Sequence, residues 1–111
     1  MKLESAEMTD AKYIQERIQQ ILAQCGIIFQ QILLFGSRAR GTSNPTSDYD
    51  FLIITQSSLT LKEKRAIEKE IRKTLAKYPL DLIIKSQSEV EILQDQIGSV
   101  VREALKEAVS L

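Results

Sequence analysis

The sequence predicts a single α/β (α+β) domain over residues 1–111, with about three main helices in the order α-β-β-α-β-α. Three apolar runs bounded by glycine, proline and small polar residues predict the strands. Three longer segments with apolar residues at helical spacing predict the helices. At 111 residues the chain can build one hydrophobic core but is too short for a separate acceptor-binding domain.

The amino-acid composition limits which ligands and which metals can be expected. A hydrophobic content of 43% and a charged content of 27% are ordinary for a soluble globular protein. The formal net charge is zero, so neither a membrane nor direct nucleic-acid binding is expected. Histidine is absent, which excludes histidine bases and zinc chemistry and leaves oxygen ligands for any divalent metal. The lone Cys25, the polar N-terminus and the lack of a membrane-length apolar run predict a cytoplasmic protein.

The first helix is expected to begin at a cap, Thr9 or Asp10, and to run to about Cys25, where Gly26 ends it. Cys25 lies on the apolar stripe, so we expect a small buried core residue rather than a reactive thiol. The stripe consists of Tyr13 or Ile14, Ile18, Ile21, Leu22 and Cys25.

The first two strands flank a polar loop. One strand is expected within residues 27–35 and leads into Gly36, and residues 38–41 are expected to form a short helical turn. The loop has its turn at Asn44-Pro45. The second strand, Tyr49–Thr55, is apolar on both faces beyond Asp50, which is typical of a central strand covered on both sides.

Thr60 and Glu63 form a capping box that predicts a helix ending near Tyr78. Between residues 62 and 77 there are seven basic and three acidic residues. Such a face is usually solvated, and the alternative is a docking patch for an acidic partner or RNA. The third strand, Leu80–Ile84, contains Asp81.

A second capping box, Ser88 with Glu91, predicts a final helix in which Gly98 permits a bend or close packing. Residues 108–111 could add a short edge strand. The inward side of this helix is expected to carry Val90, Leu93, Ile97, Val100 or Val101, Ala104 and Leu105.

Polar residues at the ends of the apolar runs suggest a site. Asp48 and Asp50 project from one face of their strand, roughly 7 Å apart, which suits carboxylates that share divalent cations. Gly36 lets the backbone approach a ligand, and the amides after it can point at an anion. Asp81 must be solvated at a strand end, paired, or bound to metal, because burying an unpaired carboxylate is costly.

The pattern Gly36-Ser37, ten residues, then Asp48-Tyr49-Asp50 resembles the signature of the DNA polymerase beta-type nucleotidyltransferase superfamily. The run Gly-Ser-Arg-Ala-Arg-Gly in so short a chain is most similar to its minimal nucleotidyltransferase (MNT) branch. This resemblance implies the nucleotidyltransferase fold, with a small mixed β-sheet.

The resemblance also implies a catalytic site of three carboxylates, Asp48, Asp50 and Asp81. They would hold two Mg²⁺ ions, with Asp81 on the acceptor side and able to help take the hydroxyl proton.

For the nucleotide, the resemblance implies ATP as donor. Gly36 and Ser37 would cradle its β and γ phosphates. Arg38 and Arg40 would add positive charge to the phosphate pocket, or either could instead anchor the loop through a structural carboxylate.

The function implied is a metal-dependent transfer of AMP from ATP to a hydroxyl group. The acceptor would be a tyrosine of a small helical partner, a HEPN-type toxin, so that the chain acts as an antitoxin. One alternative is a non-catalytic, nucleotide-binding or toxin-neutralising subunit of the same fold. Others are a small-molecule transferase with a separate helical substrate-binding subunit, and an unrelated regulatory domain whose aspartates close a turn.

Overall fold

The computed structural model describes residues 6–109 and 111, with side chains from residue 9 onward. The element order is α1 (Ala6–Gln24), β1 (Phe29–Phe35), α2 (Ser37–Arg40), β2 (Tyr49–Thr55), α3 (Leu61–Thr74), β3 (Leu80–Ser86), α4 (Gln87–Leu93) and α5 (Val100–Glu107). The expected order is confirmed, except that the final helix is divided. The polar N-terminus, one ground for expecting a cytoplasmic protein, lies largely outside the described range.

The three strands form one mixed sheet in the order β1-β2-β3. β1 is antiparallel to β2, whereas β3 is parallel to β2 and follows the crossover helix α3. The outer edge of β1 carries one antiparallel bridge, Leu34 to Val109, instead of the expected terminal edge strand. On the outer side of β3 the described residues place no strand.

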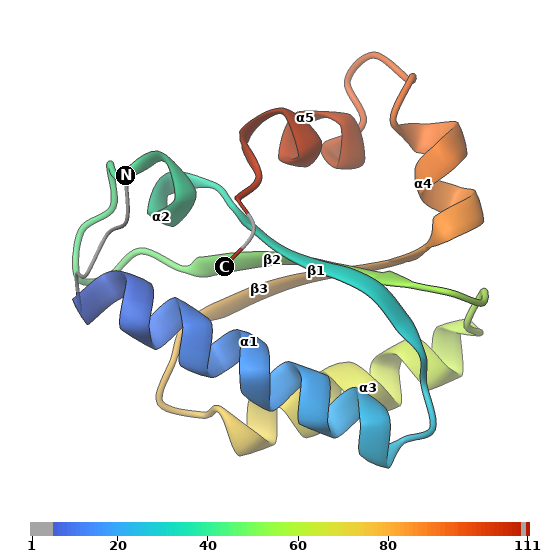
Figure 1. The fold of residues 1–111 in the computed structure, drawn as a ribbon, viewed down its shortest axis with the longest axis horizontal. Coiled ribbons are helices and arrows are strands. Elements are labelled where there is room, and N and C mark those ends of the chain that lie inside the picture. Colours follow the sequence, from blue (N-terminus) through green and yellow to red (C-terminus); the bar gives the residue numbers. More distant parts are fainter. Residues whose placement is uncertain (1–5, 110) are drawn as a thin grey trace.

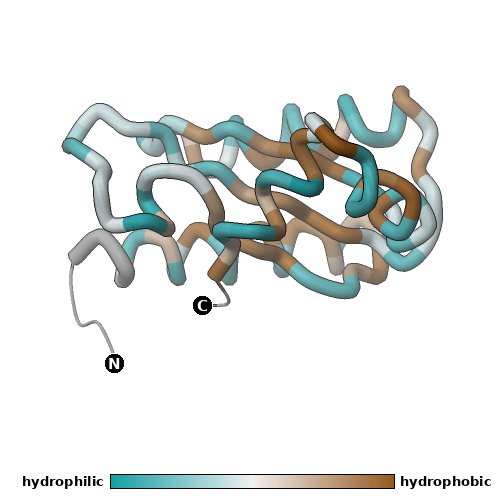
Figure 2. Tube along the Cα trace, turned by 90° about the horizontal axis from the view of Figure 1, so that it is seen from above, coloured by the Kyte–Doolittle hydropathy of each residue, from teal (hydrophilic) through white to brown (hydrophobic). Residues whose placement is uncertain are grey.

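Helices cover both faces of the sheet. α1 and α3 lie on one side, and α4 and α5 lie on the other (Figure 1). Apolar segments run through the middle of the molecule between more polar outer segments (Figure 2). This two-sided cover explains why β2 is apolar on both faces, since a strand between two layers buries alternate residues in each.

The alternation along β2 matches the prediction. Phe51 and Ile53 belong to the core under α1 and α3. Leu52 and Ile54 belong to the core under α4 and α5. Asp50 precedes Leu52 by two residues, so it lies on the α4–α5 face of the sheet.

The expected start and end of α1 need correction. The helix begins at least as early as Ala6, ahead of Thr9, and ends at Gln24. Cys25 is exposed, so the prediction of a buried cysteine is wrong. Cys25 lies in the turn where the chain leaves the helix, and Gly26 follows with a φ of 73°. A residue in that turn no longer follows the helical stripe.

The prediction of one final helix is also wrong. α4 ends at Leu93 and α5 begins at Val100. Between them, Gly98 has a φ of 86°, a left-handed conformation that does not continue an α-helix. Ser99 then caps α5, because its hydroxyl oxygen accepts from the Arg102 amide at 3.0 Å. Ile97, expected to point inward, is 91% exposed.

The capping boxes agree with the sequence in one case and shift in the other. Thr60 and Glu63 cap α3 as expected, although the helix ends at Thr74 rather than near Tyr78. The second capping box is formed by Ser86 with Glu89 rather than by Ser88 with Glu91. α4 therefore begins two residues earlier than predicted, directly after β3, which extends two residues beyond the expected Ile84.

Candidate active site

The turn between β1 and α2 lies directly against the first carboxylate of β2. Phe35 pairs with Asp50 across the two strands, which brings Gly36 beside that side chain. Gly36 has φ 75° and ψ −160°, a combination that is almost confined to glycine. A Cβ at this position would lie 2.0 Å from the Asp50 Oδ2 atom. Both backbone and space therefore require glycine here.

Asp50 and Asp81 form a carboxyl pair on neighbouring strands. They are partners in the parallel register of β2 and β3, and their side chains are close enough to hydrogen-bond. The pKa of Asp50 is raised from 3.8 to about 6, with burial as the largest cause, followed by the charge of Asp81 and its hydrogen bond. The charges of Asp48 and Glu107 contribute further. Carboxylates held this close together repel one another, and a cation bound between them would relieve the repulsion.

Asp48 stands outside this pair. It is exposed, one residue before β2 begins, at the end of a loop in which the Asn44 side chain accepts from the Thr46 amide at 2.9 Å. Among the described residues, no group of three His, Cys, Asp or Glu side chains is arranged to hold a metal ion. The structure therefore brings together Asp50 and Asp81, with Asp48 near enough to act on Asp50 by its charge.

The two arginines have different surroundings. Arg38 donates to the Ser47 carbonyl oxygen through Nη2 at 2.8 Å, and its guanidinium lies 4.1 Å from the ring centre of Tyr49. Tyr49 is buried on the α1–α3 side, as expected. These contacts tie the polar loop to the sheet, which is the anchoring role that the sequence left open for Arg38, though through a carbonyl oxygen.

Arg40 pairs with a carboxylate that sequence reasoning missed. Its Nη1 lies 2.6 Å from Oε2 of Glu107, and the other oxygen of that carboxylate accepts from the Gly36 amide at 3.0 Å. These contacts lower the pKa of Glu107, with the Arg40 hydrogen bond as the largest cause. Glu107 ends α5, 71 residues after Gly36, and no local pattern indicates such a contact.

Ser37 begins α2 immediately after Gly36 and is partly exposed. The structure brings five of the seven predicted site residues into two adjoining groups, the Gly36-Ser37 turn with Arg40 and the Asp50–Asp81 pair. The other two lie outside these groups: Arg38 belongs to α2 and contacts Ser47, and Asp48 follows Ser47 at the end of the loop.

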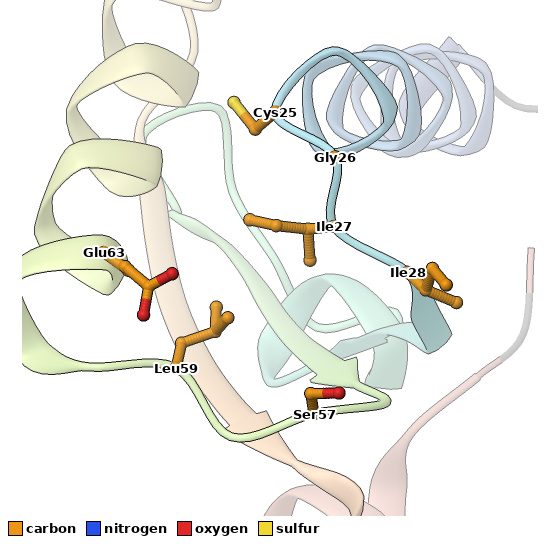
Figure 3. Close-up of a pocket in the computed structure, with 7 residues that line it drawn as sticks. All are labelled: Cys25, Gly26, Ile27, Ile28, Ser57, Leu59 and Glu63. Carbon is orange, nitrogen blue, oxygen red and sulfur yellow. The ribbon is translucent and has the colours of Figure 1, made fainter.

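One pocket lies away from these residues. It has a volume of about 190 Å³ and is lined by Cys25, Gly26, Ile27, Ile28, Ser57, Leu59 and Glu63 (Figure 3). These residues follow α1, follow β2 and begin α3, at the end of β2 opposite to Asp50. It contains none of the predicted site residues.

The fold and the site together define a nucleotidyltransferase domain. The chain belongs to the family described as Polymerase beta, Nucleotidyltransferase, whose model matches residues 16–105.

A relative from Methanocaldococcus jannaschii, named "Putative protein adenylyltransferase MJ0141", is 42% identical over 50 residues. The match covers 45% of this chain and 50% of the relative, so the chain spans about half the length of that protein.

Two solved structures share the fold. One, titled "Structure of putative minimal nucleotidyltransferase", has a TM-score of 0.58 at 20% identity, covering 91% of this chain and 95% of the other. A toxin-antitoxin structure with AMP-PNP has a TM-score of 0.57 at 19% identity, covering 86% of this chain and 69% of the other. No helix in the described part of the chain is long and apolar enough to cross a membrane.

Proposed function

We propose that this protein is a metal-dependent adenylyltransferase that moves AMP from ATP to a tyrosine hydroxyl of a small helical partner, a HEPN-type toxin. The observation that carries the proposal is the contact between the Gly36 turn and Asp50, which puts a candidate phosphate-binding turn beside a carboxyl pair. A nucleotidyl transfer needs these two groups together, because the triphosphate must be held where its charge can be neutralised.

The carboxylates present fit Mg²⁺. Asp50 and Asp81 supply oxygen ligands of the kind this ion prefers. Burial raises the pKa of Asp50, and the charges of the neighbouring carboxylates add to the shift, so a bound cation would favour the charged form. Asp48 would complete the set through a modest movement of the exposed loop end. When bound, the metal would neutralise phosphate charge and make the acceptor hydroxyl easier to deprotonate.

The residues of the chain have separate roles in this scheme. The Gly36 amide, the Ser37 hydroxyl and Arg40 bind the β and γ phosphates. The acceptor oxygen forms a bond to the α phosphorus, the bond from that phosphorus to the bridging oxygen breaks, and pyrophosphate leaves with the electron pair. Asp81, whose side chain is exposed, accepts the hydroxyl proton.

Two kinds of observation support a protein acceptor. The name of the M. jannaschii relative indicates protein adenylylation, and one fold neighbour is a toxin-antitoxin structure with AMP-PNP. Among the described residues, the large exposed apolar side chains include Ile92, Ile97 and Val100 in the α4–α5 layer, on the sheet face that carries Asp50; Tyr13, Ile28 and Leu61 are exposed elsewhere. The three side chains of that layer are available for contact with a partner. We place this activity in the cytoplasm, where ATP and Mg²⁺ are available.

The test uses the purified chain, ATP, Mg²⁺ and the helical protein encoded beside it. Intact mass spectrometry should show one added AMP on the partner, and Tyr→Phe substitution in the partner should prevent the addition. The double variant Asp48→Asn with Asp50→Asn should leave the partner unmodified. A carboxylate-to-amide change far from the site, Glu70→Gln, serves as the matched control and should retain activity.

The outcomes separate the alternatives. A partner that binds tightly and is neutralised without gaining mass would indicate the non-catalytic subunit. An unmodified partner together with efficient adenylylation of a small hydroxyl compound would indicate a small-molecule transferase. Either result would overturn the proposal.

A further inference from the structure

We propose that Glu107 is a built-in competitor of the nucleotide: its carboxylate occupies the phosphate-binding groups in the free protein and must give them up when a triphosphate binds. This inference rests on the proposed function, which assigns the Gly36 amide and Arg40 to phosphate oxygens.

The geometry of Glu107 is that of a bound anion. One carboxylate oxygen accepts from the Gly36 amide at 3.0 Å, and the other lies 2.6 Å from the Arg40 Nη1 atom. A backbone amide and a guanidinium are the groups that proteins commonly direct at phosphate oxygens. A triphosphate cannot use the Gly36 amide until the carboxylate leaves, and it has to share the Arg40 guanidinium with that carboxylate as long as the carboxylate stays.

The contact between Glu107 and Arg40 is partly open to solvent. Since the side chain of Glu107 keeps 29% of its surface exposed and that of Arg40 keeps 50%, the pair is open to exchange with solvent anions.

Release of the Glu107 side chain from Gly36 and Arg40 would also affect the C-terminal segment. Glu107 is the last residue of α5, and Val109, two residues later, exchanges backbone hydrogen bonds with Leu34 at 2.8 and 3.3 Å. α5 itself is held by Val101 and Ala104 in the core. The side chain can therefore swing away from a fixed helix, or the short segment after it can shift along the edge of β1.

The experiment measures nucleotide affinity in variants of this carboxylate. Calorimetric titrations use ATP with Mg²⁺, and inorganic triphosphate as a probe that lacks the base. Glu107→Ala removes the competing anion, and Glu107→Gln keeps its shape without its charge. Glu103→Gln is the matched control, because Glu103 lies on the same helix and pairs with Lys106 at 3.5 Å.

We expect Glu107→Ala to bind both ligands about fivefold to tenfold more tightly than the wild type, since an occupied binding site lowers apparent affinity by the fraction of free molecules. The affinity of Glu107→Gln should fall between those of the wild type and Glu107→Ala, because the glutamine side-chain oxygen can still accept from the Gly36 amide. Glu103→Gln should match the wild type. In nuclear magnetic resonance spectra, the Gly36 amide resonance should shift in Glu107→Gln without ligand.

Equal or weaker binding by Glu107→Ala, in a variant that melts like the wild type, would overturn the inference and make Glu107 an anchor of the turn. Glu107→Gln provides the same comparison if the alanine variant does not fold. Failure of every variant and the wild type to bind ATP or triphosphate would overturn the proposed function, and this inference with it.

Discussion

Replacing Asp50 by asparagine should stabilise the folded protein at neutral pH while removing its proposed catalytic role. The side chain is partly buried against Gly36 and beside Asp81, and its pKa is raised from 3.8 to about 6. Asparagine has nearly the same shape, can still hydrogen-bond to Asp81 and carries no charge. The substitution therefore removes the cost of burying a charge and the repulsion from neighbouring carboxylates, and leaves the packing in place.

The size of the effect follows from the pKa shift. A shift of about two units corresponds to about 3 kcal/mol, and solvent screening of a partly exposed carboxylate reduces this to about 1–2 kcal/mol. The folded protein holds this proton more tightly than the unfolded chain does, so wild-type stability falls as pH rises from about 4 to about 6. The gain from Asp50→Asn should therefore be small near pH 4 and complete above pH 7.

Urea unfolding followed by circular dichroism at pH 4, 6 and 8 provides the measurement. At pH 8 the unfolding midpoint of Asp50→Asn should rise by about 0.5–1 M over the wild type. Glu70→Gln, which removes an exposed carboxylate of α3, should leave the midpoint unchanged at every pH. Added Mg²⁺ should stabilise the wild type and narrow the gap, because the ion binds the folded state through the same carboxylates. An equal gain at pH 4 and pH 8, or a loss at pH 8, would refute the reasoning.

Further substitutions test the fold around the site. Gly36→Ala should destabilise the wild type by about 3 kcal/mol, measured by urea unfolding. In an Asp50→Ala background the cost should be about 1 kcal/mol smaller, because the clash with Asp50 disappears while the backbone strain remains. Equal costs in both backgrounds would mean that Asp50 is not the obstacle. Ser86→Ala should lower the free energy of unfolding by about 1 kcal/mol, because α4 loses its N-terminal cap. Ser88→Ala should change it by less than about 0.5 kcal/mol. A larger loss for Ser88→Ala than for Ser86→Ala would mean that Ser88 is the cap.

Local patterns predicted the elements that local interactions decide. The bounds of β2 match because its apolar run is delimited by polar residues at both ends. The Thr60 cap matches because the capping box is completed within four residues. The final helix failed for the opposite reason. Its apolar spacing continues through Ile97, but α4 already ends at Leu93, and Gly98 and Ser99 lie in the break before α5. The sequence does not show whether the apolar spacing or the helix-breaking signal of these two residues prevails.

The candidate site divides in a similar way. Gly36, Asp50 and Asp81 could be proposed from the sequence because each lies at the end of an apolar run, and the strand register brings them together. Glu107 could not be proposed, since it meets Gly36 only through the packing of α5 against the sheet. Arg40 was recognised as a charge near the phosphate pocket, but its partner depends on that same long-range packing.

The free edge of β3 has a consequence for the behaviour of many copies together. An edge strand exposes unpaired backbone groups to which a strand of another molecule can add. Asp81 and Lys85 lie on the same face of this strand, four residues apart. A second copy joining this edge in parallel and in register would place Asp81 beside Asp81 and Lys85 beside Lys85, whereas an antiparallel copy centred on Ile83 would pair Asp81 with Lys85. The carboxylate proposed as a metal ligand would therefore disfavour some registers of edge-to-edge association and favour another.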